Sequence, residues 1–132
     1  MPEINYLAVV IAAVASFLLG GLWYSNALFG KVWQRESGVT DEQLKNGNMA
    51  KIFGLSLVLS LLASWMFAMF LGPRPPVAFG LGAGFAAGLF WVAASFGMNY
   101  LFERRSFKLF LINGGYHTLQ FTLIGLVLAF LP

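Results

Sequence analysis

The sequence has no cysteine, one histidine and few charges, since only 10% of its 132 residues are charged. The absence of cysteine excludes disulfide bonds and thiolate metal sites. A soluble domain carries about 25% charged residues, so this chain lacks the polar surface that keeps a small globule in solution. Hydrophobic residues instead make up 59% of the chain. These proportions indicate a membrane protein, and the length indicates a single domain over residues 1–132.

Charged residues divide the chain into four uncharged runs. The runs cover residues 4–30, 52–73, 75–102 and 109–131. Each exceeds the roughly 20 residues that a helix needs to cross a hydrocarbon core about 30 Å thick. Backbone amides in lipid must find partners within their own segment, so each run should form a helix. We therefore expect an all-α integral membrane protein built as a four-helix bundle.

The basic residues predict the orientation of this bundle. Of the eight lysine and arginine residues, only Arg74 lies outside the two connections 31–51 and 103–108, which fall on the same side. The positive-inside rule places these connections in the cytoplasm and both termini on the non-cytoplasmic side. We therefore expect a multi-pass protein of the cytoplasmic (inner) membrane, with the lipid bilayer as its partner. The basic pI of about 9.5 is then a topology signal, and no nucleic-acid partner is expected.

The first connection also carries the pattern of a short helix. In "VTDEQL", Thr40 is placed to cap a helix and Gln43 is placed to close a capping box. An interfacial helical turn is one interpretation of this segment, and a solvated loop is the other.

Small residues recur at four-residue intervals along the runs. Helices in a bilayer associate through close backbone approach, which small side chains permit. We expect helix packing at Ala12, Ser16, Gly20, Gly80, Gly84, Gly88, Gly114 and Thr118. The glycine row of the third run exceeds what one contact within the bundle needs. This excess predicts a helix shared between protomers, and hence a homo-oligomer.

Polar residues gather in the half of the bundle near the basic connections. The candidates for a polar vestibule are Tyr24, Asn26, Ser60, Ser95, Asn99, Asn113, His117 and Gln120. On a helix, Asn113, His117 and Gln120 share one face. His117 lies about 13 Å in from Lys108 at 1.5 Å per residue. Facing lipid would be costly for these groups, so they should face the bundle interior or an inward-open cavity. Taken singly, each is also typical of a hydrogen bond between helices.

The segment "NYLAVVIAAVASFLLGGLWYSNALFGKVW" resembles the start of a membrane family known as domain of unknown function 1761. The residues that carry the resemblance are Asn5, Gly20, Trp23, Tyr24, Ser25, Leu28, Phe29, Gly30 and Trp33, with Gly115 and Tyr116 near the start of the last run. Many members have proline after the serine, where this chain has Asn26. The resemblance implies a bacterial four-helix membrane protein and supplies no activity.

Two function hypotheses remain. The runs contain no carboxylate and one histidine, so neither a metal set nor a nucleophile–base pair is present, and we expect no enzyme activity and no cofactor. The first hypothesis is an oligomeric channel or carrier for an ion or small solute, with an inward-facing polar vestibule. The alternative is a structural or regulatory membrane subunit, in which the polar layer only sets helix packing.

Overall fold

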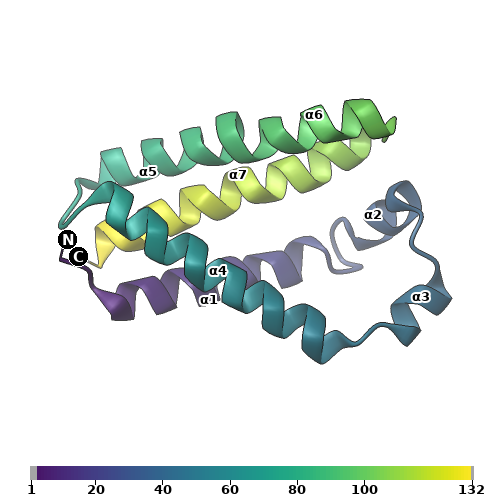
Figure 1. Cartoon of the computed structure of the whole chain (residues 1–132), viewed down its shortest axis with the longest axis horizontal. Coiled ribbons are helices and arrows are strands. Elements are labelled where there is room, and N and C mark those ends of the chain that lie inside the picture. The colour runs from purple at the N-terminus through teal and green to yellow at the C-terminus, as the bar shows by residue number, and fades with distance from the viewer. Residues whose placement is uncertain (1–2, 132) are drawn as a thin grey trace.

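The computed structural model describes residues 3–131, and all regular secondary structure in this part of the chain is helical, with no strand. The helices are α1 (Tyr6–Trp23), α2 (Gly30–Ser37), α3 (Asp41–Asn46), α4 (Met49–Leu71), α5 (Val77–Ala86), η1 (Ala87–Ala93), α6 (Ala94–Glu103) and α7 (Phe107–Phe130). The helices α5, η1 and α6 follow one another without a break and form one long rod (Figure 1). η1 is a π-helical segment inside that rod.

Three helical stretches are long and apolar enough to cross a membrane: Tyr6–Trp23, Met49–Leu71 and Val77–Glu103. Large apolar side chains are exposed along all three, including Leu18, Leu59 and Phe90. Such a surface is what a lipid-facing helix requires and a soluble monomer avoids. α7 is equally long, with 24 residues, but carries polar side chains in its middle.

Side-chain caps fix where the helices begin. The side-chain oxygens of Asn5, Asn48 and Ser106 accept hydrogen bonds from backbone amides three residues ahead, at the starts of α1, α4 and α7. At α3, Thr40 and Gln43 form the reciprocal bonds of a capping box. The helical interpretation of the first connection is therefore confirmed.

The first uncharged run forms a helix and then a tight turn. α1 ends at Trp23, whereas the run continues to Gly30. The turn is closed by backbone bonds from Phe29 N to Trp23 O at 3.0 Å and from Gly30 N to Ser25 O at 2.9 Å. A Cβ atom at Gly30 would collide with the carbonyl of Tyr24, so glycine is needed at this position. The turn redirects the chain into α2.

α7 lies at the centre and contacts α1, α2, α4, α5, η1 and α6. The α5–η1 rod lies along it through the predicted glycine row. A Cβ atom at Gly80 would lie 2.5 Å from the carbonyl oxygen of Gly125, and one at Gly88 would lie 2.7 Å from that of His117. At Gly84 it would collide with the carbonyl of Phe121. The row therefore serves packing within the chain, and it no longer argues for a helix shared between protomers.

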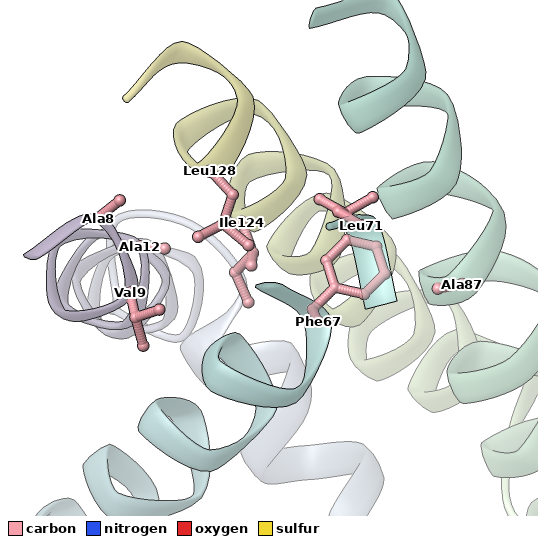
Figure 2. Close-up of a cluster of buried hydrophobic side chains, with 8 residues drawn as sticks. All are labelled: Ala8, Val9, Ala12, Phe67, Leu71, Ala87, Ile124 and Leu128. Atoms are coloured by element: carbon pink, nitrogen blue, oxygen red, sulfur yellow. The ribbon is translucent and has the colours of Figure 1, made fainter. Parts of the chain in front are cut away.

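On the other side of α7, small residues of α1 meet larger ones of α4 and α7. Figure 2 shows the buried cluster, which consists of Ala8, Val9, Ala12, Phe67, Leu71, Ala87, Ile124 and Leu128. Ile124 is fully buried at its centre. The predicted packing positions Ala12 and Ser16 are both buried in the α1–α4 side of the molecule.

The connections separate to the two ends of the molecule. α2, α3 and the turn between α6 and α7 lie at one end, and both ends of the described chain lie at the other with the α4–α5 turn (Figure 1). Asn5 Nδ2 donates to the carbonyl oxygen of Leu131 at 3.3 Å and so links the first and last helices. The two basic connections therefore share one end, and Arg74 lies at the opposite end.

The glycine contact predicts a difference between two neighbouring glycines of α5. Gly84→Ala forces a methyl group against the α7 backbone and should lower the free energy of unfolding by about 1–3 kcal/mol. Gly82→Ala is the control, because a Cβ atom there meets nothing within 4 Å. It should be neutral or stabilising by up to about 1 kcal/mol through helix propensity. Unfolding in mixed detergent micelles, followed by circular dichroism, measures both. Equal effects would contradict the packing.

Candidate functional site

Asn113, on the polar stretch of α7, joins three segments through its carboxamide. Tyr24 Oη donates a hydrogen bond to Asn113 Oδ1 at 2.6 Å. Asn113 Nδ2 donates to Tyr100 Oη at 2.6 Å. Tyr24 follows α1 and Tyr100 belongs to α6, so one side chain links α1, α6 and α7. The carboxamide suits this place because it offers an acceptor and a donor at once.

Two further aromatic side chains tie α1 to α7 beside this link. Tyr116 Oη donates to the backbone carbonyl oxygen of Ser16 at 2.9 Å, and Trp23 Nε1 donates to that of Ile112 at 2.9 Å. A Cβ atom at Gly20 would lie 2.9 Å from Tyr116 Oη, so the glycine makes room for the hydroxyl. Each donor bonds to a backbone carbonyl oxygen of the facing helix, so the polar tips of these partly buried aromatic side chains are satisfied.

His117 and Gln120 form a pair one turn further along α7. His117 Nδ1 and Gln120 Oε1 are 2.7 Å apart. The ring of Phe96 stacks on the imidazole at a centroid distance of 5.0 Å, and the ring of Tyr116 meets it edge-on at 4.8 Å. With the carboxamide oxygen as acceptor, Nδ1 carries the proton and Nε2 is left with a lone pair. Within residues 3–131, Nε2 has no hydrogen-bond partner.

A separate group of hydroxyls lies between α1 and α4. Ser16 Oγ and Ser60 Oγ are 2.6 Å apart, and each also lies within hydrogen-bonding distance of the carbonyl oxygen of Ala13, at 3.0 and 3.2 Å, so two hydroxyl protons serve three contacts. Ser64 Oγ, one turn beyond Ser60, is buried and has no hydrogen-bond partner among the described residues. Hydrogen bonds between membrane helices return about 0.6 kcal/mol on average, so this group adds modestly to the α1–α4 contact.

The structure brings together only part of the predicted vestibule. Tyr24 and Asn113 are bonded, and His117 with Gln120 adjoins them through Tyr116. Ser60 belongs to the α1–α4 group. The side chains of Asn26, Ser95 and Asn99 are exposed, and Ser95 Oγ bonds only to the carbonyl of Trp91 in its own helix.

The π-helical segment η1 explains the positions of Ser95 and Asn99. Counting 100° per residue from the glycine row puts both on the face toward α7. A π-helix closes i→i+5 hydrogen bonds, so it takes more residues per turn than an α-helix. Residues after η1 are therefore rotated relative to that count, and Tyr100 instead of Asn99 reaches α7. Such segments occur often at functional sites.

The sequence reasoning missed Tyr100, Tyr116, Trp23 and Phe96 as members of the site. Aromatic residues in membrane helices are usually packing or interfacial groups, so residue type alone did not mark these four as site residues. A signal was nonetheless present, because Trp23 and Tyr116 both lie among the residues that resemble the family. The remaining predicted packing positions lie in α7, where a Cβ atom at Gly114 would be 3.2 Å from Ala93 Cβ and Thr118 is buried.

The fold thus defines an all-helical protein with apolar helices of membrane-spanning length. A family model described as "Protein of unknown function (DUF1761)" matches residues 7–129, and the chain belongs to this family. No curated protein and no solved structure matches the chain. The resemblance of the first 33 residues is therefore confirmed over almost the whole chain.

The tyrosine contacts predict measurable losses of stability. Tyr24→Phe and Tyr100→Phe each remove one bond to Asn113, and each should cost about 0.6 kcal/mol, with an upper limit near 1.7 kcal/mol. Tyr6→Phe is the matched control, because Tyr6 is exposed on α1. Detergent unfolding measures all three variants. In Asn113→Leu the two tyrosine substitutions should lose most of their effect, and full additivity would contradict the network.

Proposed function

We propose that all four long helical stretches cross the cytoplasmic membrane as a four-helix bundle, with both termini on the non-cytoplasmic side. With 24 residues, α7 is about 36 Å long at 1.5 Å per residue, which exceeds the hydrocarbon thickness. Its polar side chains bond to Tyr24, Tyr100 and each other, which lowers the cost of placing them in lipid. The shared end of the two basic connections supports the orientation.

This topology can be tested with single cysteines, because the natural chain has none. Lys45→Cys in α3 and Arg74→Cys in the α4–α5 turn are both at exposed positions at opposite ends. In sealed membrane vesicles of known orientation, an impermeant maleimide should label Lys45→Cys only from the cytoplasmic face and Arg74→Cys only from the other. The wild-type chain is the unlabelled control. Labelling of both positions from one face would rule out the four-span arrangement.

We further propose that the protein is a structural or regulatory membrane subunit without enzyme activity, in which the polar layer fixes helix packing. The supporting observation is that the hydrogen bonds of the polar groups are made between helices. Both ends of the Asn113 carboxamide, the hydroxyls of Tyr24 and Tyr116 and the indole of Trp23 are all bonded across helices. A network satisfied in this way rigidifies one arrangement of helices.

A channel or carrier is the second candidate, and the His117–Gln120 pair favours it. The imidazole is half-buried in an apolar helix, and its Nε2 is free of protein partners within the described residues. Ionisable side chains inside membrane segments often mark a path for protons or ions. In this candidate, the unbonded nitrogen accepts a proton or contacts a small solute that enters from the cytoplasmic end.

Proteoliposomes separate the two candidates. The structural proposal expects proton, sodium and potassium fluxes equal to those of protein-free liposomes. A flux that the wild type shows and His117→Phe abolishes, with the helical content unchanged, would overturn it. Ser95→Ala is the control, because its hydroxyl is exposed and bonds only within its own helix. It should match the wild type under either candidate.

A further inference from the structure

An open pocket of about 590 Å³ lies at the end of the molecule where the basic connections meet. It is lined by Arg35, Glu36, Glu103, Arg104, Arg105 and Ser106. The first two belong to α2, Glu103 is the last residue of α6, and the others lie in the turn between α6 and α7; α2 and this turn lie side by side at this end (Figure 1). Arg105 Nη1 donates to the carbonyl oxygen of Ser37 at 3.1 Å and so holds the two walls together.

The charge of this pocket is not balanced from within. Three guanidinium groups face two carboxylates. Arg35 Nε lies 3.6 Å from Glu36 Oε2, and Arg105 Nε lies 3.6 Å from Glu103 Oε1. These contacts are ion pairs of partly exposed side chains and are weakened by water. Arg104 forms no ion pair within residues 3–131, and the turn presents it from a left-handed backbone with φ of 59°. The pocket therefore attracts anions.

The surface beside the pocket is strongly apolar. Leu101 is 80% exposed, Phe102 is 90% exposed and Phe107 is 70% exposed, and these residues flank the same α6–α7 turn. A small soluble anion gains nothing from such neighbours. An amphiphile with an anionic head and hydrocarbon chains gains from both parts of the surface at once.

We propose that this pocket binds the phosphate headgroup of an anionic phospholipid, whose acyl chains cover Leu101, Phe102 and Phe107. The guanidinium groups of Arg35 and Arg104 contact the phosphate. Arg104 is the arginine of the pocket that has no carboxylate partner among the described residues, and Arg35 comes from the facing wall. Basic pockets between helices at the cytoplasmic face have the chemistry that anionic headgroups require. Positive charge on this side serves topology, but topology alone does not require the arginines of two distant segments to share one pocket.

Lipid titration followed by native mass spectrometry tests the proposal on the detergent-purified full chain. The wild type should bind phosphatidylglycerol more tightly than phosphatidylcholine. In the double variant Arg35→Gln/Arg104→Gln, the phosphatidylglycerol affinity should fall about thirtyfold, to the level of phosphatidylcholine. The matched control is Lys45→Gln/Arg74→Gln, which removes two positive charges outside the pocket, one of them from another left-handed arginine. It should retain the wild-type selectivity.

A second variant and a second probe distinguish a lipid from a free anion. Phe102→Ser/Phe107→Ser changes only exposed side chains and should weaken phosphatidylglycerol binding while the arginines remain. Glycerol phosphate, which lacks acyl chains, should bind far more weakly than the lipid. Equal binding of glycerol phosphate would overturn the lipid assignment. Unchanged selectivity in Arg35→Gln/Arg104→Gln, or no selectivity in the wild type, would overturn the site. Circular dichroism checks that each variant folds. If the arginine variant fails to fold, phosphatidylglycerol binding by the phenylalanine variant still tests the site.

Discussion

Two helix backbones approach closely where Gly80 of α5 meets Gly125 of α7, and a Cβ atom on either glycine would collide with the opposite carbonyl. Helices in lipid gain little from removing apolar surface, since acyl chains are as apolar as leucine, so packing contacts must supply the attraction. The close approach continues through Gly84 to Gly88 and brings η1 beside the polar part of α7. It thereby places Phe96 and Tyr100 where they meet His117 and Asn113. The polar cluster thus depends on glycine contacts that involve no polar side chain and are made mainly with backbone atoms.

The polar middle of α7 accounts for its central position. Asn113, His117 and Gln120 in the middle of a long helix carry a free-energy cost wherever they face lipid, and hydrogen-bond partners on neighbouring helices reduce that cost. Tyr24 and Tyr100 supply them from two sides, and Tyr116 fastens the adjoining face to α1. α1 and α4 bury the small hydroxyls of Ser16, Ser60 and Ser64, and together with the α5–η1–α6 rod they leave wide apolar faces exposed. The division between one polar central helix and apolar outer helices follows from this difference.

Patterns in the sequence predicted the helices better than their contacts. Some features are local and could be predicted directly from the sequence: the uncharged runs, the capping box at Thr40 and the family motif. The glycine row identified the residues on one side of a helix contact. The partner of that row lay outside the reach of periodicity, because spacing does not say which helix faces it. The sequence also could not predict that Tyr100 instead of Asn99 faces α7. The π-helical segment η1 changes the number of residues per turn, and the sequence gives no clear sign of a π-helix.

The polar cluster and the basic pocket act on the same helices. Trp33 of α2 packs edge-on against Tyr24 at 6.0 Å, and Arg105, which lines the pocket, donates its backbone amide to the carbonyl of Tyr100 at 2.9 Å. The two tyrosines that hold Asn113 are therefore each in contact with one wall of the pocket. A ligand that draws α2 toward the α6–α7 turn favours the arrangement in which both tyrosine bonds form, and by linkage the formed network favours the ligand. In the proposed lipid complex, the bound headgroup and the buried network stabilise one helix arrangement through a shared set of contacts.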